Sequence, residues 1–138
     1  MITILPMTAI DIPEALALWQ SSEGIALHEA DSPEKLAEYL LRNPCTSFVA
    51  RDGARLAGVS LAGHDGRRGY LHHVAVDAHY RKKGLGRAIV ERCLSALKEQ
   101  GIQKCHIFVL ADNEGGKKFW TSIGWHERNG LQLMSIAL

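Results

Sequence analysis

The chain contains one turn that is rich in both glycine and positive charge, Arg81-Lys82-Lys83-Gly84-Leu85-Gly86-Arg87. The residues before it, Tyr70–Asp77, alternate like a β-strand, and about fifteen residues after it follow helical periodicity. The turn therefore leads from a strand into a helix. The first turn of a helix leaves backbone N–H groups unpaired and carries partial positive charge, so successive cations there favour an anionic ligand such as a phosphate. Gly84 and Gly86 have no Cβ, which lets the backbone approach such a ligand closely.

Other interpretations of this turn have to be weighed. A basic run at a helix start is often plain solvated surface. The dinucleotide fingerprint does not fit, because Gly84–Ile89 lacks its third glycine and Lys104 stands where an acid would hold the ribose. The P-loop does not fit either, because Gly115–Lys118 has the wrong spacing and no hydroxyl. If the turn binds phosphate, it therefore does so with a motif other than the dinucleotide fingerprint and the P-loop.

Two blocks of the sequence resemble the GNAT family of N-acetyltransferases. Val74-Ala75-Val76 followed by Arg81-x-x-Gly84-x-Gly86 resembles the acetyl-CoA signature of that family, Gln/Arg-x-x-Gly-x-Gly/Ala. Asn113 with Phe119-Trp120-x-x-x-Gly124-Trp125 is similar to its second block. The two blocks occur in the family's order and spacing, and the resemblance covers residues 45 to 128.

Composition limits the class of protein. A length of 138 residues predicts a single domain, 1–138, that is long enough to bury a core. A formal net charge of +1 argues against a general nucleic-acid or membrane binder. The three cysteines contain no Cys-x-x-Cys pair, and their odd number suits reduced thiols. Met1–Pro6 lacks the features of a signal peptide and no apolar run is long enough to cross a bilayer, so we expect a cytoplasmic protein.

The hydrophobic patterns predict the secondary structure. Helices are expected to start at Asp11-Ile12-Pro13-Glu14, at Ser32-Pro33-Glu34, after Gly84, and at Asp112 or Asn113. Strands are expected at Ile2–Leu5, Thr46–Arg51, Arg55–Ala62, Tyr70–Asp77 and Cys105–Leu110, followed by a hairpin at Asn129-Gly130 that leaves Leu131–Leu138 as the last strand. A helix crosses between Tyr70–Asp77 and Cys105–Leu110, so these two strands should be parallel.

The predicted fold class is therefore mixed α/β and similar to that of the GNAT family. It has a central, mostly antiparallel twisted sheet of about seven strands, flanked by about four helices. The resemblance adds that the one parallel pair of strands splays apart.

The resemblance implies that acetyl-CoA is the cofactor and indicates where it binds. Backbone groups of the strand would pair with its pantetheine arm where the parallel strands splay, and the turn would bind its pyrophosphate. The cofactor-binding residues implied in this way are Val74, Ala75, Val76, Arg81, Lys82, Lys83, Gly84, Leu85, Gly86, Arg87, Asn113 and Trp120.

A proton acceptor is needed as well, because a lysine-like amine has a pKa of about 10.4. Some members of the family use a glutamate at the position of Phe108, and serotonin acetyltransferases use two histidines. Here His72 matches the second of those histidines and Tyr70 stands at the first, so His72 and Tyr70 are the candidate catalytic residues. Strand alternation would place both on one face and His73 on the other, so only one of the adjacent histidines would line the acceptor site. A buried structural histidine is the alternative interpretation.

Two further positions limit the chemistry. Trp120 stands where most members of the family have a tyrosine that protonates the leaving thiolate. Its indole N–H can donate a hydrogen bond but is no practical acid, and packing around the cofactor is the simpler interpretation. No metal site is expected, because adjacent histidines on a strand face opposite ways and no third ligand is evident.

The sequence thus predicts an N-acetyltransferase that moves an acetyl group to a primary amine by direct transfer in a ternary complex. The acceptor would be a small-molecule or peptide amine, with no nucleic acid or membrane as partner. Two alternatives stay open: acetylation of a protein N-terminus or lysine, and a sensor that binds acyl-CoA without turnover. The resemblance also leaves open a homodimer formed through the final apolar strands.

Overall fold

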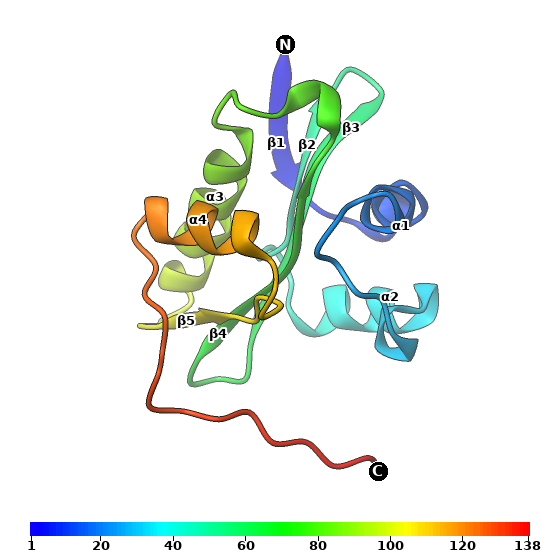
Figure 1. The fold of residues 1–138 in the computed structure, drawn as a ribbon. Coiled ribbons are helices and arrows are strands. Elements are labelled where there is room, and N and C mark those ends of the chain that lie inside the picture. The colour runs from blue at the N-terminus through cyan, green and yellow to red at the C-terminus, as the bar shows by residue number, and fades with distance from the viewer. The chain divides into compact units, whose positions relative to one another are not determined.

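The computed structural model describes all 138 residues and divides the chain into two compact units, Met1–Phe108 and Val109–Leu138. Each unit is described by itself below, and Figure 1 shows the ribbon of both.

The first unit is built on a five-stranded sheet in the order β1-β2-β3-β4-β5 (Figure 1). Its strands are β1 (Ile2–Pro6), β2 (Phe48–Asp52), β3 (Arg55–His64), β4 (Gly69–Val76) and β5 (Cys105–Ile107). The first four strands pair antiparallel, and β5 pairs parallel with β4, as predicted for two strands joined by a crossing helix. The mixed α/β class expected from the sequence is confirmed.

Three α-helices belong to this unit, and each begins where the sequence signals it. They are α1 (Ile12–Gln20), α2 (Pro33–Arg42) and α3 (Leu85–Glu99), and short 3₁₀ turns precede them at Ala9–Asp11, Glu29–Asp31 and Ala78–Tyr80. Prolines occupy the first turn of α1 and α2, where a missing N–H does no harm. Ser32 caps α2 by accepting a hydrogen bond from the backbone N–H of Lys35 at 3.2 Å.

The helices lie on the two faces of the sheet, with α1 and α2 on one side and α3 on the other (Figure 1). The core on the first side contains Trp19 of α1, Leu36 of α2 and Val59 of β3, all essentially inaccessible to solvent. On the other side, α3 lies so close to the sheet that a Cβ at Gly58 would be 2.7 Å from Ile89 Cδ1. None of the helices combines the length and apolar character that crossing a membrane requires.

The second unit contains one helix, α4 (Glu114–Ser122), and no strand. The turn at Asn129-Gly130 is present, but the predicted hairpin and the strand Leu131–Leu138 are wrong. A strand is stable only when its backbone groups find a neighbouring strand, and this unit offers none. The sheet therefore has five strands instead of about seven, and β5 ends at Ile107, earlier than the predicted Leu110.

Candidate active site

The parallel strands β4 and β5 pair over a short distance only. Their register joins Gly69–Leu71 to Cys105–Ile107 and then ends. From His72 to Val76, β4 keeps β3 as a neighbour on one side and has no strand on the other. The splayed parallel pair that the resemblance implies is confirmed, and it leaves backbone groups of β4 open to a ligand that binds like an added strand.

A β-bulge interrupts β4 at this point. Ala75 pairs with Val59 and His72 pairs with Leu61, so His73 and Val74 together lie opposite the single residue between them on β3. His73 adopts a left-handed backbone conformation with φ of 55°, which is strained for a residue with a Cβ. A bulge of this kind cannot be recognised from period-2 alternation.

Because of the bulge, the side chains of β4 lie on other faces of the sheet than strict alternation predicts. Tyr70 pairs with Gly63, where an added Cβ would lie 2.5 Å from the hydroxyl of Tyr39 on α2. Val76 pairs with Gly58, which faces α3. The prediction that Tyr70, His72, Val74 and Val76 share one face is therefore wrong, because the extra residue in the bulge reverses the alternation beyond it.

Both adjacent histidines lie on the side of α1 and α2, contrary to the prediction that only one could. The ring of His73 lies 5.2 Å from that of Trp19 on α1, and its Nε2 is 3.0 Å from Asp31 Oδ1. The side chains of His73 and Asp31 are 18% and 11% exposed. Sequence reasoning missed this pair, because 42 residues separate the two and no local motif links them.

His72 lies among aromatic rings. Its ring centroid is 6.3 Å from that of Tyr39, 6.4 Å from that of Tyr70 and 6.2 Å from that of Phe108. Burial lowers the pKa of His72 below its ordinary value of 6.5, the neighbouring His73 lowers it further, and Asp31 opposes the shift. At neutral pH the imidazole is therefore uncharged, which is the state that can accept a proton.

The turn before α3 has the backbone features of an anion site. Gly84 precedes the helix with φ of 78°, and no side chain caps the helix start. The N–H groups of Leu85, Gly86 and Arg87 are the first of α3, where intrahelical acceptors are missing. Lys82 also has a left-handed conformation, with φ of 63°.

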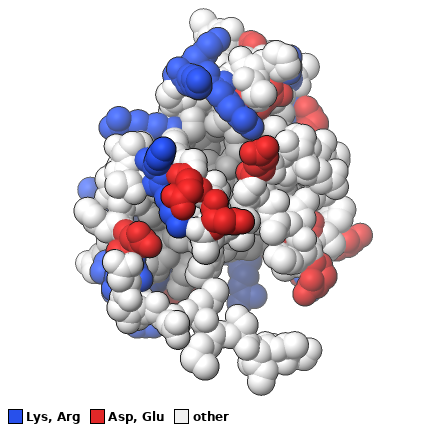
Figure 2. Space-filling model, viewed as in Figure 1, with Lys and Arg blue, Asp and Glu red and all other residues white.

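Cations surround this helix start. Arg81, Lys82, Lys83 and Arg87 are exposed, and Figure 2 shows Lys and Arg side chains gathered above the beginning of α3. Arg81 Nε donates to the carbonyl oxygen of Val76 at 3.1 Å, and Arg87 pairs with Glu91 at 3.0 Å. Lys82 and Lys83 have no carboxylate partner. An uncapped helix start with two unpaired lysines fits a phosphate group.

The remaining predicted residues, Asn113 and Trp120, belong to the second unit. Asn113 caps α4, because its Oδ1 accepts a hydrogen bond from the backbone N–H of Gly116 at 2.9 Å. Trp120 is 8% exposed and packs edge-to-face on Trp125 with ring centroids 4.8 Å apart. These contacts give both residues a structural role, and their role toward the cofactor stays a prediction.

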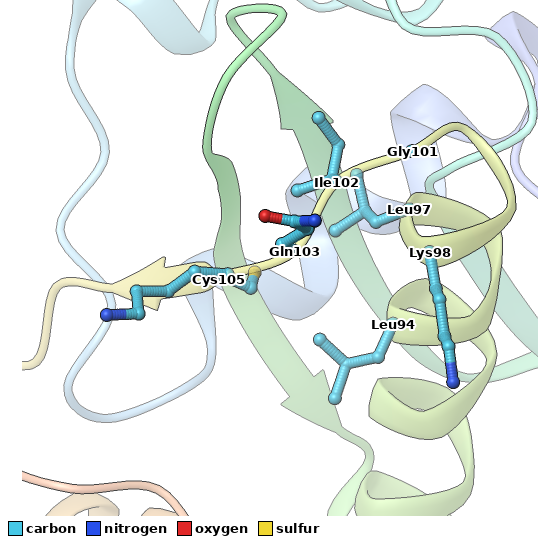
Figure 3. Close-up of a pocket in the computed structure, with 8 residues that line it drawn as sticks. Leu94, Leu97, Lys98, Gly101, Ile102, Gln103 and Cys105 are labelled. Atoms are coloured by element: carbon cyan, nitrogen blue, oxygen red, sulfur yellow. The ribbon is translucent and has the colours of Figure 1, made fainter.

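A groove of about 610 Å³ lies at the opposite end of α3. Figure 3 shows it between the last turns of the helix, at Leu94, Leu97 and Lys98, and the segment that enters β5. Cys105 lines the groove, and burial raises the pKa of its thiol to about 11. Burial raises the pKa of Cys93 to about 12. Neither thiol is activated as a nucleophile. The chain also contains no group of three or more His, Cys, Asp or Glu side chains arranged to hold a metal ion.

The open edge of β4 and the uncapped, cationic helix start that follows it suit a donor with an extended arm and a phosphate group. The chain belongs to the Acetyltransferase (GNAT) family, whose sequence profile matches residues 12–125. The family resemblance seen in the sequence is thereby confirmed, and so is the enzyme class. Acetyl-CoA as the acetyl donor agrees with this membership.

Individual relatives are distant in sequence. Acetyltransferase SG1711 of Sodalis glossinidius is 25% identical over 129 residues, which cover 93% of this chain and 89% of that protein. The ribosomal-protein-S18-alanine N-acetyltransferase of Escherichia coli has a similar structure, with a TM-score of 0.75 at 23% identity over 93% of this chain and 79% of that one. The PaiA N-acetyltransferase of Thermoplasma acidophilum, crystallised with coenzyme A, has a TM-score of 0.77 at 20% identity over 90% of this chain and 89% of that one. At these identities the structural likeness supports the fold.

Proposed function

We propose that residues 1–138 form one catalytic domain that acetylates a primary amine while donor and acceptor are bound together. Acetyl-CoA would supply an acetyl group activated as a thioester. The observation that carries the proposal is the open edge of β4 at His72–Val76, bordered by an uncharged histidine and followed by the uncapped start of α3.

The donor would be held by the backbone and by positive charge. Val74, Ala75 and Val76 lie where β4 has no strand on its outer side, and this edge is available to an extended, strand-like arm, although the carbonyl of Val76 already accepts a hydrogen bond from Arg81. The first N–H groups of α3 and the unpaired Lys82 and Lys83 are available to phosphate. Asn113 and Trp120 are assigned to the donor from the sequence resemblance alone.

His72 would accept the proton that the acceptor ammonium must lose. An alkylammonium has a pKa of about 10.4, so a neutral base beside it is required at physiological pH. The proton would move from the amine nitrogen to a ring nitrogen of His72, directly or through water. Tyr70, whose ring is nearly parallel to that of His72 at an angle of 11°, would orient the acceptor through its hydroxyl.

A protein N-terminus is the second candidate acceptor. The similar structure from Escherichia coli acts on the alanine of ribosomal protein S18, according to its name. Phe108 stands where the resemblance places the glutamate base of such enzymes. An N-terminal amine has a lower pKa of about 7.7 to 8.0, so a weaker base than for a lysine-like amine is enough to remove its proton.

Two further properties belong to the same proposal. A homodimer is suggested by the exposed apolar side chains of the C-terminal segment, which includes Leu133, Met134 and Ile136. A cytoplasmic location is suggested by the free thiols of Cys45, Cys93 and Cys105.

The test is turnover of acetyl-CoA by the purified protein with a panel of primary amines. Release of the free coenzyme A thiol gives the rate, and mass spectrometry identifies the acetylated product. We expect turnover that falls strongly in His72→Gln. Binding of acetyl-CoA without turnover of any amine, including N-terminal peptides, would instead indicate a sensor.

A further inference from the structure

We propose that the aromatic side chains around His72 form a subsite for a primary amine that carries a flat apolar group, such as an arylalkylamine. The aromatic patch, as we name it, consists of Tyr39, Tyr70, His72, His106 and Phe108. This inference rests on the proposed acetylation of an amine and specifies the chemistry of the acceptor.

Three rings of the patch are nearly parallel. The ring planes of Tyr70 and His72 differ by 11°, those of Tyr70 and Phe108 by 13°, and those of His72 and Phe108 by 24°. The three ring centroids are 6.2 to 6.4 Å apart. Rings at this spacing and inclination present aromatic surface on which a planar group can stack or lie edge-on.

The patch lies where the acceptor is needed. Tyr70 and His72 come from β4, and Phe108 follows β5 directly, so the rings flank the point where the two strands stop pairing. Tyr39 approaches from α2, with its ring edge-on to His72 at 77°. A group resting on these rings places its amine beside the proposed base.

Phe108 is more exposed than the two rings beside it, Tyr70 and His72. Its side chain is 58% exposed and directly follows β5, the edge strand of the sheet. A ligand that covers this exposed ring would remove its apolar surface from water, which favours binding.

The charge near the patch argues against a polycationic acceptor. The neighbouring carboxylate, Asp31, is 11% exposed and already bound to His73 at 3.0 Å. The aromatic rings offer cations only the negative faces of their π systems. Ring faces attract a single ammonium group, but a chain of several ammonium groups has no flat apolar part to cover the rings, whereas an arylalkylamine has both.

The test compares three probes, which are 2-phenylethylamine, n-butylamine and spermidine, on the parent protein and three variants. Phe108→Ala removes the exposed ring, and Phe108→Tyr retains it. Leu41→Ala is the matched control, because Leu41 is an exposed apolar residue on α2, 83% accessible, outside the patch. The readouts are kcat/KM for each amine and, independently of turnover, calorimetric binding of 2-phenylethylamine in the presence of coenzyme A.

We expect kcat/KM for 2-phenylethylamine to exceed that for n-butylamine about tenfold, and this ratio to vanish in Phe108→Ala. Phe108→Tyr and Leu41→Ala should keep the ratio. Equal use of 2-phenylethylamine and n-butylamine, or preference for spermidine, would overturn the aromatic subsite and leave amine acetylation standing. Calorimetric binding that Phe108→Ala abolishes, without turnover of any amine, would support the subsite and refute the proposed reaction.

Discussion

The indole Nε1 of Trp19 donates a hydrogen bond of 2.6 Å to the carbonyl oxygen of His73, a residue 54 positions further along the chain. Trp19 is inaccessible to solvent and lies in α1, and His73 is the left-handed residue of the bulge in β4. The hydrogen bond therefore ties the bulge, and with it the position of both histidines, to the core on the α1 side.

Trp19→Phe should destabilise the protein and lower its activity together. The phenyl ring keeps most of the packing but leaves the carbonyl of His73 without its donor, at a cost of about 1–3 kcal/mol in the free energy of unfolding. Urea unfolding and kcat measure the two effects. Gln20→Ala, an exposed neighbour on α1, should change neither. Unchanged kcat in a destabilised Trp19→Phe would show that the bulge does not depend on this bond.

Replacement of Arg81, Lys82 and Lys83 by alanine together should strongly weaken donor binding. If acetyl-CoA has a Kd of about 10 µM, about 1 mM of it stabilises the parent by about 2.7 kcal/mol. The variant should lose most of this stabilisation, seen as a smaller rise in the melting temperature. The control is Lys98→Ala with Lys104→Ala, which removes charge at the other end of α3. An equal rise in the parent and in the triple variant would place the phosphate elsewhere.

Stability should depend on pH through His72. Burial lowers its folded-state pKa below the ordinary 6.5, so below that value the unfolded chain binds a proton that the folded protein resists. The contribution of uncharged His72 to the free energy of unfolding is complete above about pH 6.5. It falls as the pH is lowered and is fully lost below the folded-state pKa. Urea unfolding across this range should show a smaller dependence in His72→Phe. The kcat/KM of the parent should show an acidic limb with an apparent pKa below 6.5.

Gly63→Ala should destabilise the protein by overpacking. A Cβ there would lie 2.5 Å from Tyr39 Oη and 2.6 Å from Asn43 Cγ. Asn43 is buried, and its Oδ1 accepts a hydrogen bond from the N–H of His64 at 2.9 Å, so it cannot move freely. We expect a loss of about 1–3 kcal/mol in urea unfolding. Gly130→Ala, which meets no atom within 4 Å, should change stability little.

The C-terminal segment should control self-association. Leu131, Leu133, Met134 and Ile136 are 65%, 76%, 89% and 87% exposed, and the proposed homodimer would cover these apolar side chains. Light scattering should give twice the 15.2 kDa of one chain, and deletion of residues 131–138 should give a monomer. A monomeric full-length protein would refute the homodimer.

Local features of the site could be predicted from the sequence, and long-range ones could not. The turn around Gly84 and the cap at Asn113 depend on neighbouring residues, so their residue types and spacing were sufficient. The bulge at His73 depends on the register of β3 and on a hydrogen bond from α1, and the pairing of His73 with Asp31 depends on tertiary structure. The final strand was predicted from apolar residues that favour strands, but its formation requires a neighbouring strand as well.

The open edge of β4 also has a consequence for handling the protein. An unpaired strand edge is a template for pairing with other chains, and proteins protect such edges with charged side chains. Arg81 provides part of this protection, because its Nε occupies the carbonyl of Val76. The rest of the edge, from His72 onward, has no strand partner. Preparations without ligand should therefore aggregate faster than those kept with coenzyme A, and Arg81→Ala should aggregate fastest.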